Sequence, residues 1–320
     1  MIIRGSKEYF VTVCSYSFLP QVVTLYRSLS AVCARFELWI ICVDSSAFEL
    51  LSKCQLDDVR LLNLELIESS DLKSFRATRS LREFCWTLSP YAPKLVFDTC
   101  QEAQRVTYID ADLWFRKSPK LIFDEFLDSK KGVLITEHAF FPVNDMSATS
   151  GKYCVQFMIF DRIKGERVRR WWEDRCAEWC FAKHEDGKFG DQLYLDDWDE
   201  RFPNEVCVMS RPNLILAPWN VFRFPYGDSC VWHFHGTRLA RLNGKYIIYT
   251  GQPLPKVVID NVYAPYAEEL KNSCFMLEKF GFIVQPQHSL SLSRVVKDYL
   301  KAQIYPFIGQ CGIHCETLNR

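Results

Sequence analysis

The chain has 320 residues, and its 39 basic and 39 acidic side chains give a formal net charge of zero. This balance leaves no excess of positive charge for a nucleic-acid backbone, so recognition of an anionic ligand must come from a local group of side chains. Hydrophobic residues make up 48% of the chain and aromatic residues 15%, which is enough to build the core of a large α/β domain.

The 14 cysteines are spread over the expected strands and helices. No signal peptide precedes the first expected strand, and no run reaches the roughly 18 apolar residues that a membrane span needs. We therefore expect buried thiols in a protein of the reducing cytoplasm. The alternative is a zinc site formed by Cys311, His314 and Cys315 with Cys176 and Cys180 as distant partners, but the helical spacing of the last two favours core thiols.

Apolar runs alternate with helical periodicity in the first part of the chain. The expected strands are residues 9–14, 38–43 and 59–64, and the expected helices are residues 22–33, with Pro20 at the start, and residues 48–56. Strands with so few polar residues are typical of a sheet that is covered on both faces. The order predicts a doubly wound α/β fold with a largely parallel sheet, whose ligand lies beyond the carboxyl ends of the strands. The loop Cys14, Ser15 and Tyr16 follows the first strand, so we expect it to contact this ligand.

Two aspartates follow the β-branched and aromatic run that begins at Arg105. If one strand continues through Ala111, Asp110 and Asp112 project to the same side and can converge on one cation. Two carboxylates at the carboxyl edge of a sheet suit Mg²⁺ or Mn²⁺ better than zinc. The alternative is a strand that exits into an Asx-rich turn. Because no glycine-rich phosphate loop follows the first strand, a nucleotide would have to be held by a metal ion and side chains.

The second half adds further strands, one long helix and several polar segments. A strand over 132–136 ends at Glu137 and His138, which either contact a substrate or form a solvated strand end. Residues 140–151 read as a loop that can cover a site. The helix over 168–180 carries an aromatic stripe toward the core, and its charged residues, Arg169 among them, are expected on a solvated face. His233 and His235 are expected to alternate on one side of a strand.

From about residue 251 the pattern changes to two helices, over 264–279 and 290–304. We therefore expect a main domain over residues 1–250 and a helical extension over 251–320 that packs on it. The apolar stripe of the second helix either docks on the main domain or lies on the inner surface of an anionic membrane.

Four motifs in one order give the chain a resemblance to known enzymes. They are Val106-Thr107-Tyr108-Ile109-Asp110-Ala111-Asp112, Gln156-Phe157-Met158-Ile159-Phe160, Asp191-Gln192 and His233-Phe234-His235-Gly236. This order resembles the retaining, metal-dependent glycosyltransferases of the GT-A fold, in particular the glycogenin and bacterial lipopolysaccharide galactosyltransferase group. Phe84-Cys85-Trp86-Thr87 and residues 189–198 add a similarity to bacterial glycosyltransferase-like proteins of surface-polysaccharide clusters. The resemblance covers residues 9–240 and makes residues 1–250 a GT-A catalytic domain.

The resemblance implies a nucleotide-sugar donor, a UDP-sugar above all, and Mn²⁺ or Mg²⁺. Asp110 and Asp112 stand at the Asp-x-Asp positions and His233 at the third metal ligand, and Asp110 also belongs to the nucleotide site. Asp191 and Gln192 match a pair that faces the sugar, and we expect them to be catalytic.

Other positions match the group in part. Gly236 stands at the glycine that lets the backbone approach the diphosphate. Leu239 replaces the lysine that follows it, so Arg238 is expected to act instead, and Lys94 lies near a basic residue that precedes the Asp-x-Asp motif. The asparagine expected before the next strand has no match, since Cys154 or Gln156 stands there. Weaker substrate contacts are expected from Glu137, His138, Gln156, Trp219, Asn220 and His235.

The chemistry fits hexosyl transfer to a glycan, a lipid-linked saccharide or a protein hydroxyl, as in polysaccharide biosynthesis. A nucleoside diphosphate departs only when its developing charge is neutralised, which a divalent ion with Arg238 or Lys94 supplies. An oxocarbenium-like sugar needs a nearby oxygen dipole, for which Gln192 or Asp191 are candidates, and we expect retention by attack on the same face. The alternatives are a sugar-nucleotide hydrolase and a non-catalytic glycan- or nucleotide-binding module with a degenerate site.

Overall fold

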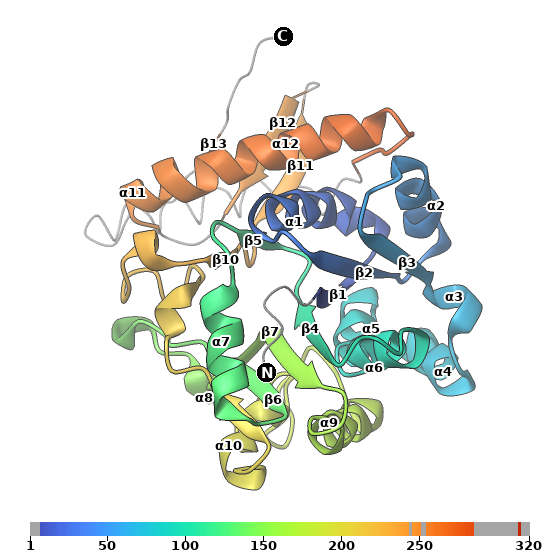
Figure 1. Ribbon diagram of the computed structural model, residues 1–320. Helices are drawn as coiled ribbons and strands as arrows, with labels where there is room; N and C mark the ends of the chain where they lie inside the picture. Colours follow the sequence, from blue (N-terminus) through green and yellow to red (C-terminus); the bar gives the residue numbers. More distant parts are fainter. Residues whose placement is uncertain (1–6, 243–244, 251–253, 285–312, 315–320) are drawn as a thin grey trace.

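A seven-stranded sheet forms the centre of the computed structural model, which describes residues 7–242, 245–250, 254–284 and 313–314. The strand order is β3, β2, β1, β4, β7, β6, β8 (Figure 1). In this sheet β7 is antiparallel to its neighbours β4 and β6, and the other pairs are parallel. The strands are β1 (Glu8–Cys14), β2 (Phe36–Cys42), β3 (Val59–Asn63), β4 (Arg105–Ile109), β6 (Val133–Glu137), β7 (Tyr153–Asp161) and β8 (Val206–Val208). The predicted mixed, mostly parallel sheet is confirmed.

Helices cover both faces of this sheet, because successive side chains of a strand point to opposite sides. Phe10 of β1 belongs to the core cluster under α1, α2 and α7, whereas its neighbour Val11 belongs to the cluster under α5, α6 and α9. The helices on the sheet are α1 (Leu19–Val32), α2 (Ser45–Cys54), α3 (Leu64–Ile67), α4 (Ser70–Thr78), α5 (Leu81–Leu88), α6 (Tyr91–Thr99), α7 (Lys120–Ser129), α8 (Ser147–Ser150), α9 (Glu166–Glu178) and α10 (Trp198–Arg201). Since helices cover both faces of the central strands β1, β2 and β4, these strands read as largely apolar runs, whereas the edge strand β3 is only partly buried.

Polar side chains set the points at which the helices begin. Asp44 accepts a hydrogen bond of 2.8 Å from the backbone N–H of Ala47 at the start of α2. Ser80 and Glu83 form a capping box at the start of α5. Such caps satisfy the unpaired N–H groups of a first turn. Because of its cap, α2 begins at Ser45, ahead of the start at residue 48 that apolar spacing alone predicts.

Two three-stranded sheets complete the fold. One contains β5 (Leu113–Phe115), β10 (Val231–His233) and β9 (Ile215–Leu216), and the other contains β11 (Arg238–Leu242), β12 (Lys245–Tyr249) and β13 (Ile313–His314). Strand β4 ends at Ile109, and the chain turns over Asp110 to Asp112 before β5 begins. The expectation of one strand through Ala111 is therefore wrong, because the chain leaves the large sheet there to pair with β10.

The C-terminal helix α12 (Ala264–Glu278) follows α11 (Lys256–Val258) and packs along the outside of α1 (Figure 1). The hydroxyls of Thr24 and Ser273 are 2.8 Å apart across this contact. The helix expected over 264–279 is confirmed, whereas the one expected over 290–304, and the membrane contact based on it, lies outside the described residues. None of the helices in the described ranges combines the length and hydrophobicity that a bilayer span requires. The division at residue 250 stays a prediction.

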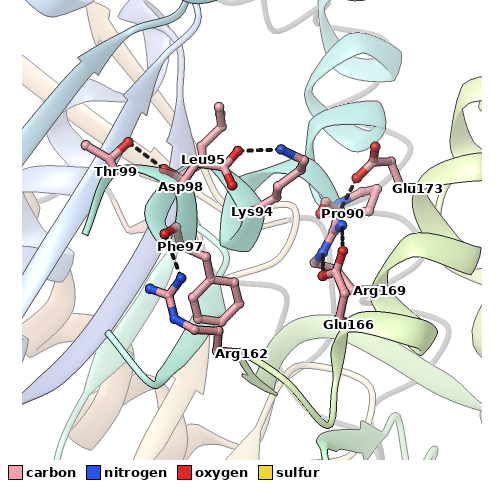
Figure 2. Close-up of polar contacts among 10 residues, drawn as sticks. All are labelled: Pro90, Lys94, Leu95, Phe97, Asp98, Thr99, Arg162, Glu166, Arg169 and Glu173. Atoms are coloured by element: carbon pink, nitrogen blue, oxygen red, sulfur yellow. Dashed lines mark hydrogen bonds and ion pairs between the residues drawn. The ribbon is translucent and has the colours of Figure 1, made fainter. Parts of the chain in front are cut away.

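Arg169 on α9 is buried, contrary to the expectation that the charges of this helix are solvated. Its side chain is only 1% exposed, donates a hydrogen bond of 3.0 Å to the carbonyl of Pro90 and pairs with Glu166 and Glu173 (Figure 2). A charge can be buried when it is paired and hydrogen-bonded in this way. The contacts fix α9 against the start of α6.

The cysteines in the described part of the chain form no disulfide. Cys176 and Cys180 are fully buried in the core cluster under α9, as expected for core thiols. The side chains of Cys311, His314 and Cys315 lie outside the described residues, so a zinc site there stays a prediction.

Candidate active site

Asp110, Asp112 and His233 form a potential metal-binding group whose ligand atoms all lie within 4.8 Å of one another. The turn after β4 carries the aspartates, and β10 delivers the histidine opposite Leu113 of β5. Nε2 of His233 lies 3.1 Å from Oδ1 of Asp112 and 3.7 Å from Oδ2 of Asp110. The pairing of β5 with β10 therefore brings together the three residues that the sequence predicted as metal ligands.

The electrostatics of this group favour a bound cation. Burial raises the pKa of Asp110 to about 6, since the positive charge of His233 offsets only part of its cost and Asp112 adds to it. Burial also tends to raise the pKa of Asp112, but the charge and the hydrogen bond of His233 have the larger effect. The pKa of Asp112 therefore lies below its ordinary value. One imidazolium thus serves two buried carboxylates. A divalent ion that accepts oxygen and imidazole ligands fits this donor set, once the imidazole has lost its proton.

Gln156 on β7 orients the imidazole of His233. Nδ1 of His233 lies 2.7 Å from Oε1 of Gln156, and both side chains are buried. An amide oxygen only accepts hydrogen bonds, so Nδ1 carries a proton and Nε2 faces the two carboxylates. The buried Nε2 of Gln156 has no hydrogen-bond partner among the described residues, and its expected contact with substrate stays a prediction.

Asp191 is connected to Asp110 through two hydroxyl groups that sequence reasoning missed. The hydroxyl of Tyr108 donates to Oδ1 of Asp110 at 3.1 Å, and Ser89 donates to the hydroxyl of Tyr108 at 3.3 Å. Burial raises the pKa of Asp191 to about 7, an interaction with Ser89 opposes this shift, and the charge of Asp110 adds to it. Tyr108 was detectable, since it precedes Asp110 by two residues at the end of a strand. Ser89 carries no comparable signal.

The backbone around Asp191 is fixed from two sides. The indole N–H of Trp172 on α9 donates to the carbonyl of Asp191 at 2.8 Å. Gly190 has a φ of 56°, in the left-handed region that glycine adopts without strain. Gln192 donates from its amide nitrogen to the carbonyl of Ser150. The predicted catalytic pair is therefore joined to the end of the 140–151 segment, which contains α8.

His138 and Asn220 point into the fold and do not have the predicted substrate contacts. His138 is 3% exposed, places Nδ1 2.9 Å from the carbonyl of Gly151 and stacks on Phe140 with ring centroids 4.7 Å apart. Asn220 is fully buried and bonds to the backbone of Ala217 and His138. Their polar groups hold the walls of the site together, whereas Glu137 remains half-buried at the end of β6.

Trp219 and His235 are gathered at the metal-binding group. The ring of Trp219 meets that of His233 at 90° with centroids 5.3 Å apart, and it lies 5.4 Å from the ring of His235. His235 is exposed and follows the end of β10, so the expected alternation of the two histidines along one strand is wrong. Trp219 supports His233, and His235 lies at the opening of the site.

Buried neutral His138 makes folding stability depend on pH. Burial lowers the pKa of His138 to about 3, well below the value near 6.5 of an unfolded chain. The unfolded state then binds the additional proton, so this contribution is complete above about pH 6.5 and is lost as the pH falls toward 3. Between pH 7 and 5 the wild type should lose ~2 kcal/mol from this residue, whereas His138→Gln should lose none from this position. Urea denaturation at both pH values measures the difference, and equal losses in the two proteins would contradict it.

The predicted nucleotide loop is held by contacts that the sequence did not reveal. The N–H of Tyr16 donates to Oδ2 of Asp44 at 2.9 Å, and its hydroxyl accepts from the N–H of Ile283 at 3.0 Å. Cys14 is 1% exposed and Ser15 is 6% exposed. Asp44 thus serves both as the cap of α2 and as the anchor of this loop, at the carboxyl ends of β1 and β2.

The expected phosphate-binding residues are placed differently from one another. Lys94 pairs with Asp98 one turn along α6, and not with either metal-binding aspartate (Figure 2). Gly236, with a φ of 72°, directly follows His235 and stands three residues after His233, and Arg238 begins β11. The structure therefore does not bring Lys94 to the group, whereas Gly236 adjoins it.

Comparison with known proteins identifies relatives of this chain. No protein-family model matches it. YfnF of Bacillus subtilis (strain 168), which is described as uncharacterized, is 31% identical over 252 residues, or 73% of this chain and 83% of YfnF. The chain belongs to the YfnF family. YfnD of the same organism, also described as uncharacterized, is 26% identical over 306 residues, or 89% of this chain and 97% of YfnD.

Solved glycosyltransferases share the architecture of this YfnF-family protein. The galactosyltransferase LgtC, solved with donor and acceptor sugar analogs, has a TM-score of 0.53 at 12% identity over 82% of this chain and 95% of its own. GlyE of Streptococcus pneumoniae TIGR4 has a TM-score of 0.50 at 12% identity, over 86% of this chain and 63% of the GlyE chain. The bifunctional WbbM has a TM-score of 0.50 at 10% identity, over 88% of this chain and 53% of the WbbM chain. The likeness shows the GT-A fold, as the motifs predicted.

Proposed function

We propose that the protein is a metal-dependent glycosyltransferase, which moves a sugar from a nucleotide-sugar to a hydroxyl group of an acceptor. The observation that carries this proposal is the cluster of Asp110, Asp112 and His233 at the carboxyl end of β4, with buried Asp191 linked to it through Tyr108 and Ser89. In open α/β sheets this edge is where ligands bind. The GT-A fold supports the proposal, since LgtC, GlyE and WbbM are glycosyltransferases.

Asp110, Asp112 and His233 are the proposed ligands of Mn²⁺ or Mg²⁺. Such an ion neutralises the negative charge that develops on a departing diphosphate. Gln156 keeps Nε2 of His233 directed at the carboxylates, so the donor atoms are arranged before a ligand arrives. Arg238 follows Gly236 by two residues and is the proposed second partner of the diphosphate.

Asp191 and Gln192 are the proposed catalytic pair. The buried carboxylate of Asp191 can stabilise positive charge on the sugar, because little water competes for it in this position. The amide nitrogen of Gln192 is held by Ser150, which leaves its amide oxygen as the candidate dipole beside the anomeric carbon. We further propose a UDP-hexose as donor and retention of its anomeric configuration.

Thermal stability in the presence of nucleotides tests the donor site. We expect one of UDP, GDP, ADP and dTDP to stabilise the wild type in the presence of Mn²⁺, by ~2.7 kcal/mol at 100-fold excess over its dissociation constant. The same nucleotide should have no effect in EDTA or on Asp112→Ala, because the diphosphate then lacks its bridging cation. Stabilisation that is equal with and without Mn²⁺ would contradict the proposed site, as would the absence of any nucleotide effect on the wild type.

Turnover separates transfer from the two alternatives. A glycosyltransferase consumes the donor faster when an acceptor is supplied, whereas a sugar-nucleotide hydrolase reaches its full rate with water alone. A binding module with a degenerate site is stabilised by nucleotide but never cleaves the sugar-nucleotide. Release of nucleoside diphosphate, followed with and without saccharide mixtures, distinguishes the three.

A further inference from the structure

One face of helix α5 lines the candidate active site along its length. Arg82, Cys85, Trp86 and Ser89 follow one another at the spacing that places side chains on the same side of a helix. Ser89, just after the helix, bonds to Tyr108 at the inner end of the site. Midway along the face, Trp86 packs on Gly190, the neighbour of Asp191, and at the outer end Arg82 is exposed. The face therefore extends from the buried hydroxyl network, past the segment that carries Asp191, to an opening at the protein surface.

Three aromatic rings form a surface beside this opening. Trp86 and Phe189 have ring centroids 5.8 Å apart, and His184 stacks on Phe189 at 4.4 Å with an angle of 13° between the rings. Trp86 and Phe189 are half-buried and His184 is exposed. We call Trp86, Phe189 and His184 the aromatic platform.

The platform is fixed to the catalytic segment. Trp86 packs directly on Gly190, where an added Cβ would lie 3.2 Å from Cε3 of the indole. The loop that carries Phe189 is tied to α5 by a hydrogen bond of 2.8 Å from the N–H of Ala182 to Oε1 of Glu83. Since Phe189 precedes Asp191 by two residues, a molecule on the platform lies next to the proposed catalytic pair.

Arg82 adds a polar edge to the platform. Its guanidinium carbon lies 5.7 Å from the centre of the Trp86 ring, and the residue is exposed. A guanidinium carries five N–H donors and no acceptor, so it suits hydroxyl or other oxygen groups of a ligand. An apolar flat surface with convergent donors at one edge is the usual composition of a small-molecule subsite.

We propose that the aromatic platform binds a pyranose ring of the acceptor saccharide, with Arg82 donating to its oxygen atoms. A pyranose presents C–H groups on its faces and hydroxyl groups around its rim, which match the rings and the guanidinium respectively. This inference rests on the proposed function and assigns its acceptor class as a glycan, in preference to a protein hydroxyl.

Saturation-transfer NMR with methyl glycosides of glucose, galactose, mannose and N-acetylglucosamine tests the platform. Binding is measured with and without saturating UDP and Mn²⁺, on the wild type, Trp86→Leu and Phe189→Leu. Leucine keeps apolar bulk but removes the flat ring, so both variants should fold. We expect at least one glycoside to bind the wild type and each variant to raise its dissociation constant by about tenfold, the loss of ~1.4 kcal/mol of stacking. Phe275→Leu, an exposed aromatic on α12, is the control and should change nothing.

The outcomes separate this inference from the proposed function. Failure of every glycoside to bind the wild type, or unchanged binding in both variants, would overturn the platform as a saccharide site. Loss of UDP stabilisation in Trp86→Leu with intact glycoside binding would overturn it too, since the ring would then hold the nucleobase. Loss of glycoside binding alone, with UDP stabilisation unchanged, supports it. An absent nucleotide effect on the wild type counts against the proposed function and leaves the measurement without UDP as the test of the platform.

Discussion

Asp112→Asn is expected to lower the rate of glycosyl transfer by about 10³-fold, which corresponds to ~4 kcal/mol of transition-state stabilisation. Asparagine keeps the shape of the side chain but removes the charge that lies 3.1 Å from Nε2 of His233. The proposed metal site then loses one of two carboxylates, so both the affinity for Mn²⁺ and the stabilisation of a departing diphosphate should fall. Initial rates at saturating donor, together with calorimetric titration of Mn²⁺, measure the two effects.

A matched control distinguishes loss of the site from a general change of charge. Asp128 is an exposed carboxylate on α7, so Asp128→Asn removes the same charge at a different place and should keep the wild-type rate. Because Asp112→Asn also loses the ion pair with His233, the rates are compared at a temperature at which circular dichroism shows both proteins to be folded. If Asp112→Asn retained more than a tenth of the wild-type rate at saturating Mn²⁺, the assignment of Asp112 as a metal ligand would be untenable.

The fold was predictable where burial dictates residue type. Strands β1 and β2 lie under helices on both faces, so they leave apolar runs that the sequence reveals directly. The boundaries were less accurate, because caps such as Asp44 act through one hydrogen bond and leave no periodicity.

The residues of the proposed metal-binding group were predictable, but the backbone arrangement that brings them together was not. The sequence pointed to Asp110, Asp112 and His233, but it left open whether the two aspartates lie on one continuous strand or in a turn after it. In the structure the chain changes sheets at Asp110, because Leu113 pairs with His233, which lies far away in sequence. Periodicity reports local exposure only, so a partner so distant leaves no local signal.

Polar residues in the walls of the site show a further limit of the sequence. His138 and Asn220 were expected to contact substrate, and both bond to the backbone of the protein. Gln156 bonds through Oε1 to His233, and its buried Nε2 has no hydrogen-bond partner within the ranges that the structure describes. A polar residue that is buried and satisfied looks the same in sequence as one that faces a ligand. Arg169 shows the same limit on α9, since its burial depends on the carbonyl of Pro90, which belongs to another part of the chain.

Asp191→Asn is expected to reduce activity about 10²-fold and to stabilise the fold at the same time. The activity should fall because asparagine cannot offer negative charge to the sugar. For the wild type, kcat/KM should rise with pH up to about 7 and then level off, since the pKa of Asp191 is raised to about 7 and the ionised form is the active one. The variant should lack this rise, and a pH–rate profile of the two proteins measures it.

The ionised carboxylate of Asp191 that supports activity lowers the stability of the fold. The folded pKa of Asp191, about 7, lies above the value near 3.9 of an unfolded aspartate, so the folded state binds the additional proton between these values. Wild-type stability is therefore lost as the pH rises from 4 to 7, and at pH 8 the cost is on the order of 4 kcal/mol. The gain from Asp191→Asn should accordingly be larger at pH 8 than at pH 5, by roughly 2–3 kcal/mol, as measured by urea denaturation without ligands.

A catalytic carboxylate can be distinguished from a structural one because its replacement lowers activity but raises stability. A structural aspartate that is paired in the fold loses stability when it is replaced, at every pH at which it is ionised. Asp191 is instead buried near the charge of Asp110, a costly position for an ionised carboxylate of the kind that is frequent at functional sites. Asp191→Asn that is both inactive and less stable at pH 8 would assign the residue to the core and move the catalytic role to Gln192.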